Sequence, residues 1–426
     1  MHILEIPSFF PPYGGLFCLD QSKALASLGH EVRIVANVQL SVKRSLKDYL
    51  FAATDTRETV MDGITVLRHE MRGWPKVVRP NARRWVALVR RMAAQYIAVY
   101  GRPDVLHAHC TNRAGYAAML IGRDYGIPYI ITEHLSSMIY RLEFGDISRE
   151  AAPDSTGNSN RHRQMPWQLP LLREALHSAA MVIPVSAELV DDLEPYFGRD
   201  YRYTALSNTI DTEFFAYRER RPSESGSERP FTFCALGINV PRKAYDILIP
   251  AFLLFARRHP EARLIIAGRD TEKLNVRKFS AELSDVRDRT SACSGQNIGM
   301  SPPASAETNI VLAGETDKNG VRDILYSSDC LVLPTRSEAQ GLVLLEAMST
   351  GIRTITTEAA PRNVRIEGGC TVVPVDDVRA LAEAMEAVYA TPFSGGEALS
   401  ERVSAVCSPR AVGLKLEEIL AQAQCR

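Results

Sequence analysis

The sequence predicts an α/β protein with two open, mostly parallel sheets that are covered by helices on both faces. Short apolar runs alternate with amphipathic stretches, a polar segment at 217–230 interrupts this alternation once, and the alternation then restarts. Strands and helices that alternate with short loops are typical of parallel sheets. The length of 426 residues also exceeds what one ordinary hydrophobic core accommodates, so two domains are expected.

The first domain is expected to span 1–217, with apolar runs that include HILEI, EVRIVANV, GITVLRHE, PDVLHAH, IPYIITEH and MVIPVS. A linker is expected at 218–230, where Ser, Pro and charged residues occur without periodicity. The second domain is expected at 231–409, and a helix at 410–426 is expected to return toward the first domain. Two polar segments, 145–166 and 277–307, are interpreted as surface insertions.

Composition narrows the class of protein. The fifty basic residues balance the fifty acidic ones, so nucleic acid is not an expected partner. The eight cysteines form no CxxC pair and lie in apolar stretches, which indicates reduced thiols in a cytoplasmic protein. The N-terminal MHILEIPSFFPP resembles a first strand more than a signal peptide. No apolar run approaches the roughly 20 residues that span a bilayer.

The segment 330–351 predicts a strand, a loop and a helix. CLVLP is β-branched and ends at a proline, TRSEAQG is a loop, and the helix is expected from about Leu342 to Ser349. The first N–H groups of a helix are unpaired and attract anions. The N–H groups of Gly341, Leu342 and Val343 are therefore expected to bind a diphosphate.

Two glutamates flank this helix start. Glu346 lies one turn into the helix, where its carboxylate is placed to accept hydrogen bonds from a ribose. Glu338 lies on the loop and is expected to bind hydroxyls of the group attached to the diphosphate. The alternative, an acidic residue near a helix start and an exposed Glu346, is about as compatible with the spacing alone.

Other candidate residues also follow strands. Lys243 is placed to neutralise a leaving diphosphate. Gly14 and Gly15 precede a helix, and their lack of a side chain lets a ligand approach the backbone. For each of these three residues an ordinary loop or turn position is the alternative.

The HAH sequence places His107 and His109 on one side of a strand, and His109 is expected to reach the ligand cleft. A metal pair is disfavoured because no Asp or Cys is suitably placed nearby. Glu133 and His134 end the next strand, where they either line the same cleft or cap the backbone.

The stretch RPNARRWVALVRRM (79–92) predicts a basic helix. Its five arginines accompany Trp85, Val86 and Val89 at helical spacing. Such a helix either lies on anionic lipid as a peripheral membrane contact or packs Trp85 into the protein. The sequence favours the second reading slightly.

These motifs together resemble the retaining glycosyltransferases of family 4, which have the GT-B fold. The resemblance covers nearly the whole chain: FPPYGG with ALASLGHEV, PDVLHAHC, SNTIDTEFF, PRKAYDILIPAF, ARLIIAGR and the E-x7-E pattern of Glu338 and Glu346. It implies two Rossmann-like doubly wound domains facing a cleft. It also implies catalytic roles for His109, Lys243 and Glu338, and donor binding by Gly14, Gly15, Gly237, Arg242, Gly341, Leu342, Val343 and Glu346.

The implied activity is retaining, metal-independent transfer of a hexose in surface polysaccharide biosynthesis. The donor would be a nucleotide diphosphate sugar and the acceptor a glycan or a lipid-linked saccharide, with no cofactor. The expected location is the cytoplasm, at the inner face of the membrane where the acceptor is a lipid. The sequence departs from the family pattern at Ile238, where an arginine is usual, at Ala244, where a glycine is usual, and at Ala339-Gln340, where Gly-Phe is usual.

Two other GT-B activities remain as alternatives: a sugar-nucleotide epimerase and a non-catalytic binding protein. The E-x7-E pattern and the glycines of the first loop disfavour the epimerase. Ile238 supports the non-catalytic protein, whereas His109, Lys243, Glu338 and Glu346 oppose it. A dehydrogenase is disfavoured because no G-x-G-x-x-G follows a strand.

Overall fold

The computed structural model describes the chain with internal gaps, and contacts between Cα atoms divide it into two compact units. The described residues are 1–42, 45–136, 139–141, 166–219, 229–279 and 309–425. Most of the expected linker and of the two expected polar insertions lies outside these residues. The first unit contains 1–210 and 406–426, and the second contains 211–405.

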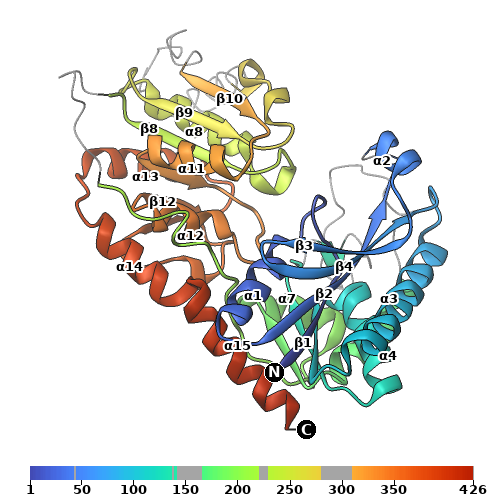
Figure 1. Ribbon diagram of the computed structural model, residues 1–426. Coiled ribbons are helices and arrows are strands. Elements are labelled where there is room, and N and C mark those ends of the chain that lie inside the picture. Colours follow the sequence, from blue (N-terminus) through green and yellow to red (C-terminus); the bar gives the residue numbers. More distant parts are fainter. Residues whose placement is uncertain (43–44, 137–138, 142–165, 220–228, 280–308, 426) are drawn as a thin grey trace. The chain divides into compact units, whose positions relative to one another are not determined.

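The first unit is built on a seven-stranded sheet with the order β3-β4-β2-β1-β5-β6-β7 (Figure 1). All neighbouring strands are parallel except β3 and β4, which form an antiparallel hairpin. The strands are β1 (His2–Pro7), β2 (Glu31–Leu40), β3 (Thr56–Met61), β4 (Ile64–Arg72), β5 (Val105–His109), β6 (Tyr129–Glu133) and β7 (Met181–Pro184).

Strand β3 was not among the expected apolar runs, because its sequence TRETVM is polar and lies at the edge of the sheet. A local signal for the hairpin is nevertheless present. Asp62 and Gly63 both have positive φ, 48° and 81°. Asp-Gly with this backbone is typical of a two-residue hairpin turn.

Helices cover both faces of the first sheet. They are α1 (Leu16–Ser27), α2 (Leu46–Phe51), α3 (Val78–Tyr100), α4 (Tyr116–Tyr125), α6 (Leu169–His177), α7 (Glu188–Phe197) and α15 (Pro409–Gln424). Ile34, Ala36 and Val38 of β2 share a core with Leu19 of α1. Asn37, which alternates with them, instead donates a hydrogen bond to the carbonyl of Trp85 in α3. Alternate side chains of β2 therefore contact helices on opposite faces of the sheet.

Helix α3 packs its apolar stripe into the protein. Trp85 and Val89 are fully buried, and the indole N–H of Trp85 donates to the carbonyl of Asn37 at 2.8 Å. Of the two readings left open by the sequence, inward packing of Trp85 is confirmed. No helix among the described residues is long and apolar enough to cross a bilayer.

Helix α15 belongs to the core of the first unit, although it lies at the end of the chain. Its residues Val412, Leu416 and Leu420 pack with Ile3 of β1 and Leu25 of α1. A Cβ at Gly413 would lie only 3.2 Å from the side chain of Leu28, so the absence of a side chain there permits close packing of α15 on α1.

The second unit is built on a six-stranded, all-parallel sheet with the order β10-β9-β8-β11-β12-β13 (Figure 1). Its strands are β8 (Thr232–Leu236), β9 (Arg263–Ala267), β10 (Ile310–Gly314), β11 (Cys330–Leu333), β12 (Arg353–Thr357) and β13 (Cys370–Val373). Its helices are α8 (Tyr245–Ala256), α11 (Lys318–Ser327), α12 (Leu342–Ser349), α13 (Val378–Ala390) and α14 (Gly396–Cys407), which ends in the first unit.

A single apolar core holds the second sheet to α8 and α13. Phe233 of β8 packs edge-on against Phe255 of α8, with ring centroids 5.3 Å apart. Leu381 and Met385 of α13 belong to the same core. The predicted fold class, two α/β sheets with helices on their faces, is confirmed.

The described cysteines are in the thiol form, as expected from their apolar surroundings. Burial raises the pKa of the Cys18 and Cys330 thiols well above the usual range. Both therefore stay protonated and behave as small apolar side chains.

Candidate active site

The loop after β11 brings Glu338 onto two cations. One carboxylate oxygen, Oε1, lies 2.5 Å from Nζ of Lys243 and 2.9 Å from Nη1 of Arg242. The hydroxyl of Thr335 donates to the same oxygen at 3.2 Å. We call these four residues the Glu338 cluster. It lies at the carboxyl ends of β8 and β11, where open α/β sheets bind ligands.

The two cations come from one short turn. Pro241–Lys243 form a single turn of 3-10 helix, and Ala244 follows with φ 51° and ψ 43°, in the left-handed region. This tight turn aims the neighbouring side chains of Arg242 and Lys243 at the same carboxylate, Glu338. Ala244 also explains why a glycine is usual here, since glycine adopts positive φ without strain.

The charges of the cluster determine the state of its carboxylate. Burial alone would raise the pKa of Glu338, but Lys243 and Arg242 outweigh burial and hold this pKa below its usual value. Lys243 is only 7% exposed. A buried lysine beside an ionised carboxylate provides a fixed positive charge for an anionic ligand.

Arg336 fixes the loop but was not singled out from the sequence. Its guanidinium binds Asp246 at 2.7 and 3.1 Å and Asp376 at 2.6 Å, and it donates to the carbonyl of Pro241 at 2.6 Å. Its backbone N–H donates to the carbonyl of Arg242. Arg336 thus ties the β11 loop to the 241–243 turn. Nothing in the local sequence TRSEAQG indicates that this arginine has partners far away in the chain.

Helix α12 begins directly after this loop, as predicted. Gly341 has φ 84° and precedes the first helical residue, Leu342, and no described side chain caps this end of the helix. The N–H groups of Leu342 and Val343 lie in the first turn, where backbone N–H groups are available to an anion. Glu346 lies one turn further and is half-buried. The structure thus places the predicted diphosphate and ribose residues on one helix end.

Gly237 passes close to Lys243 at the end of β8. A Cβ at Gly237 would lie 3.1 Å from Cε of Lys243, and the carbonyl of Gly237 accepts a hydrogen bond from the hydroxyl of Tyr245 at 2.8 Å. A larger residue at this position would displace the lysine. Ile238, which follows, contributes no charge, so the two cations at Glu338 come from the next turn.

In the first unit, Glu5 is the centre of a buried polar cluster. Its carboxylate lies 2.7 Å from Nε2 of His109 and 3.0 Å from Nδ1 of His107, and all three side chains are fully buried. Register explains the contact, because Glu5 of β1 pairs directly with His107 of β5. His109 also lies 3.1 Å from Nε2 of His134, whose ring stacks on Phe17. We call Glu5, His107, His109 and His134 the histidine cluster.

Protonation in the histidine cluster is set by burial and by mutual charge. Burial would raise the pKa of Glu5, but His107 and His109 lower it to about 2. Burial, together with the charge of His107, lowers the pKa of His109 to about 4. Burial also lowers the pKa of His134 well below its usual value. At neutral pH Glu5 is therefore ionised, and the rings of His109 and His134 are neutral.

Two expectations about the histidines are wrong. The ring of His109, which was expected to reach the ligand cleft, is fully buried. The argument against a metal pair also overlooked Glu5, since one donor atom each from Glu5, His107 and His109 lies within 4.8 Å of the others. The acid was missed because it lies inside the first apolar run, 102 residues from His107. The nitrogen–oxygen distances of 2.7 and 3.0 Å are also those of hydrogen bonds, which Glu5 forms with both rings.

Glu133 has a structural role in the described structure. Its carboxylate accepts hydrogen bonds from the N–H groups of Thr111, His134 and Leu135 at 2.8 to 2.9 Å and from the hydroxyl of Tyr140 at 2.6 Å. Of the two readings of this residue, capping of the backbone is the one that matches.

Gly14 and Gly15 form the turn before α1, with φ of 97° and 83°. A Cβ at Gly15 would lie 1.9 Å from the carbonyl oxygen of Phe9, so only glycine fits. Gly14, in contrast, has open space where a Cβ would be. The pair leaves the start of α1 without a side-chain cap, as a backbone anion site requires.

The chain forms two Rossmann-like units, and the Glu338 cluster lies at a strand end of the second. This architecture is the GT-B fold of glycosyltransferases. The chain belongs to the glycosyltransferase family that joins a glycosyl transferase 4-like domain, matched over residues 15–209, to a glycosyl transferases group 1 domain, matched over residues 230–391.

Similar proteins agree with this assignment. Mannosylfructose-phosphate synthase of Agrobacterium fabrum is 26% identical over 286 residues, which are 66% of this chain and 56% of that protein. The chain thus spans a little more than half the length of this relative. The putative teichuronic acid biosynthesis glycosyltransferase TuaC of Bacillus subtilis is 22% identical, over 84% of this chain and 81% of that protein. The structure of sucrose-phosphate synthase from Thermosynechococcus elongatus has the same fold, with a TM-score of 0.71, 17% identity and 99% coverage of both chains.

Proposed function

We propose that this protein is a retaining, metal-independent hexosyltransferase that uses a nucleotide diphosphate sugar. The acceptor would be a glycan or a lipid-linked saccharide in the biosynthesis of a surface polysaccharide. One observation carries the proposal: Lys243 and Arg242 converge on Glu338 beside the uncapped start of α12. Family membership and the similarity to TuaC support the reaction class and the kind of product.

The donor is expected to bind along α12. The N–H groups of Leu342 and Val343 and the cations of Arg242 and Lys243 would take the diphosphate. Glu346 would accept hydrogen bonds from the ribose, and Glu338 would accept them from hydroxyls of the hexose. These positive groups stabilise the leaving group without a divalent cation.

In the proposed reaction, the bond between the anomeric carbon and the diphosphate oxygen breaks as negative charge grows on the leaving group. The acceptor hydroxyl forms its bond to the anomeric carbon on the same face of the sugar. Its proton passes to the leaving diphosphate oxygen, so no separate protein base is required. Lys243 and Arg242 would stabilise the transition state more than the bound donor, because the charge on the diphosphate increases during the step.

The test begins with thermal unfolding of the whole chain in a panel of nucleotide sugars. A ligand that binds only the native state raises its stability with concentration, and at a hundredfold excess over Kd the gain is about 2.7 kcal/mol. We expect one donor to stabilise the protein and to be consumed in the presence of a saccharide acceptor. If no nucleotide or nucleotide sugar stabilises the protein, the proposal is wrong.

Two further measurements test the finer claims. Proton NMR of the product at early times should show the anomeric configuration of the donor, and an inverted product would contradict the retaining mechanism. Activity should persist in EDTA, and a loss that added magnesium restores would contradict metal independence.

A further inference from the structure

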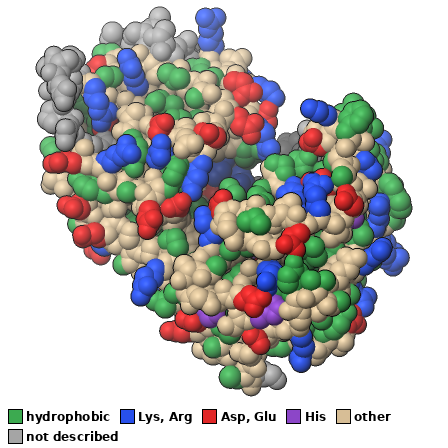
Figure 2. All heavy atoms as spheres, in the orientation of Figure 1, with side chains coloured by type: hydrophobic (Ala, Val, Ile, Leu, Met, Phe, Trp, Pro, Cys, Tyr) green, Lys and Arg blue, Asp and Glu red, His purple; other side chains and the backbone are tan. Residues whose placement is uncertain are grey.

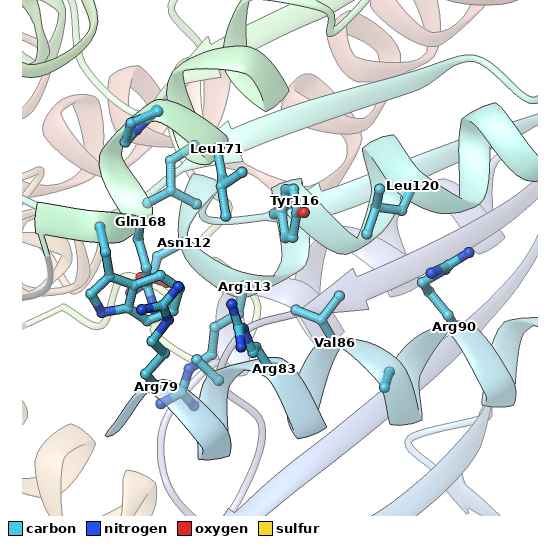
Figure 3. A pocket seen from close by; sticks show the side chains of 15 residues that line it. Arg79, Arg83, Val86, Arg90, Asn112, Arg113, Tyr116, Leu120, Gln168 and Leu171 are labelled. Atoms are coloured by element: carbon cyan, nitrogen blue, oxygen red, sulfur yellow. The ribbon is translucent and has the colours of Figure 1, made fainter. Parts of the chain in front are cut away.

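A cavity of about 500 Å³ lies within the first unit, between α3, the turn that precedes α4, and the segment that enters α6 (Figure 3). None of the residues proposed above to bind the donor lines it. Its walls combine basic and apolar side chains: Arg79, Ala82, Arg83, Val86, Ala87, Arg90, Asn112, Arg113, Tyr116, Leu120, Trp167, Gln168, Pro170, Leu171 and Leu172. We call it the arginine pocket.

Charge in the arginine pocket is strongly one-sided. Four arginines line it, and no carboxylate does so within the described part of the chain. Arg90 forms an ion pair at 2.6 Å with Asp124, which lies outside the lining. Arg79 lies over the ring of Trp167, at 5.1 Å, and Arg83 has no ion-pair partner among the described residues. A guanidinium group without an ion-pair partner, such as that of Arg83, matches the geometry of a phosphate.

The positive charge is concentrated at one end of the pocket. Figure 3 shows Arg79, Arg83 and Arg113 grouped near Asn112 and Gln168. Farther along α3, between this group and Arg90, the walls are apolar and include Val86, Leu120 and Leu171 together with the ring of Tyr116. The pocket therefore has a cationic end and an apolar channel, which together are complementary to an amphiphilic anion.

The backbone at the cationic end is strained. Arg113 has φ 65° and ψ −71°, a conformation that is unfavourable for a non-glycine residue and is concentrated at functional sites. This strain indicates that the cationic end is a functional site.

We propose that the arginine pocket binds the phosphate ester of an apolar alcohol, that is, a lipid phosphate. The phosphate lies among Arg79, Arg83 and Arg113, and the hydrocarbon chain lies along Val86, Leu120 and Leu171. A sugar phosphate fits less well, because the uncharged polar groups of the lining are confined to Asn112, Tyr116, Trp167 and Gln168, too few for the hydroxyls of a saccharide. The volume is typical of sites for small organic ligands.

This binding is independent of catalysis, but its purpose rests on the proposed function. If the protein transfers a hexose to a lipid-linked saccharide, the pocket holds the phosphate and the first part of the lipid carrier. The saccharide is then tethered to the enzyme by a group that takes no part in the chemistry. Tethering of this kind raises the effective concentration of the acceptor hydroxyl.

The test uses octyl phosphate as the probe and calorimetry as the measurement. Octanol and inorganic phosphate serve as matched probes, because each keeps one half of the molecule. We expect octyl phosphate to bind at least about tenfold more tightly than either. Equal affinity for inorganic phosphate would show that the apolar channel is not used, and equal affinity for octanol would show that the arginines are not used. Either result overturns the proposal.

Variants locate the site. Arg83→Gln should weaken octyl phosphate about tenfold or more, the usual effect of losing a charged hydrogen-bonding group. Arg91→Gln, an exposed arginine of the same helix that does not line the pocket, should change nothing. Leu120→Asp should abolish binding by placing a negative charge in the channel, and unchanged thermal unfolding would show that it still folds. Equal losses in the Arg83 and Arg91 variants, or unchanged affinity in the Arg83 variant, would contradict the assignment.

Nucleotide binding separates this inference from the proposed function. Arg83→Gln should leave the affinity for nucleotide unchanged, whereas Glu346→Ala should weaken nucleotide but not octyl phosphate. A protein that binds octyl phosphate through Arg83 but no nucleotide would retain the lipid phosphate site and refute the transferase. A protein that binds nucleotide but not octyl phosphate would refute the lipid phosphate site and leave the proposed transferase in place.

Discussion

Both units hold a buried carboxylate among basic groups, but the two carboxylates are positioned for different tasks. Glu5 lies inside β1, where its neighbours are imidazoles from an adjacent strand, and every member of that contact is fully buried. Glu338 lies on a loop after β11, where its neighbours are Lys243 and Arg242. Position along the strand makes the difference: inside the strand a side chain is enclosed by the sheet and its helices, and beyond the strand end it can meet a ligand.

The comparison also separates two uses of charge. In the histidine cluster, hydrogen bonds satisfy the single negative charge of Glu5, and the lowered pKa of His109 keeps that ring neutral. In the Glu338 cluster, two positive charges face one negative charge, which leaves a net positive charge beside the start of α12. The first arrangement stabilises the fold. The second arrangement is suited to a diphosphate, whose negative charge would balance the net positive charge.

The largest expected effect is on stability, at Glu5. Glu5→Ala should lower the free energy of unfolding by about 2–6 kcal/mol, because it leaves the buried imidazole N–H groups of His107 and His109 without an acceptor, at about 1–3 kcal/mol each. Denaturant titration measures this change. The matched control is Glu31→Ala in β2, an exposed carboxylate paired with Arg33, which should cost less than about 1 kcal/mol. Similar losses for the two variants would mean that the histidine cluster does not stabilise the fold.

The next effect is on catalysis, at Lys243. Lys243→Ala should lower kcat roughly 10²-fold, the scale of losing one preorganised electrostatic donor. Lys243→Arg should rescue only partly, because the guanidinium differs in reach and geometry. Arg242→Ala should lower kcat less, since the exposed fraction of its side chain is 28%, against 9% for the side chain of Lys243.

Steady-state kinetics with the identified donor checks the Lys243 prediction, and Arg379→Ala on α13 is an exposed control in the same unit. Near-normal kcat in Lys243→Ala, or a larger loss in Arg242→Ala, would remove Lys243 from the proposed role.

A third effect concerns affinity, at Glu346. Glu346→Ala should weaken UDP and GDP alike by roughly 1.5–3 kcal/mol, because the proposed partner is the ribose that both nucleotides share. Calorimetry measures it, with Glu383→Ala on the exposed side of α13 as the control. Unchanged affinity for both nucleotides would show that the ribose lies elsewhere.

The last effect is the pH dependence of stability, which is spread over several pH units. The pKa of His109 is lowered to about 4 in the folded protein, and that of His134 is lowered as well. Between about pH 6.5 and 4 the unfolded chain binds more protons than the folded one, so stability should fall as the pH falls. Each histidine contributes at most about 1.4 kcal/mol per pH unit. Glu5 adds to the loss only below about pH 4.5, as the pH approaches its folded pKa of about 2.

Denaturant titrations at pH 7, 6 and 5 measure this slope. His109→Gln should reduce it, whereas His259→Gln, a histidine of the second unit outside the cluster, should not. A wild-type stability that is constant over this range would contradict the assignment of neutral imidazoles to the histidine cluster.

Local pattern was sufficient for much of the fold and for part of the site. Hydrophobic periodicity predicted the two parallel sheets, and the proline, loop and glycine signals predicted α12 within its observed bounds, Leu342–Ser349. Gly341, Leu342, Val343 and Glu346 therefore share a helix end by local geometry alone. The inward packing of Trp85 likewise followed from the helical spacing of its neighbours.

What the sequence by itself determined is whatever depends on residues within one or two turns of each other: the type of each element, its main apolar face and the residues at its ends. Tertiary structure decided the contacts between strands far apart in sequence. The parallel register of β1 and β5 places Glu5 on His107 across 102 residues, and the 241–243 turn places two cations on Glu338 across about 95. It also enclosed the arginine pocket between α3, α4 and α6. Periodicity specifies which face of an element is buried, but only the packed sheet and helices specify which side chains from distant elements meet there.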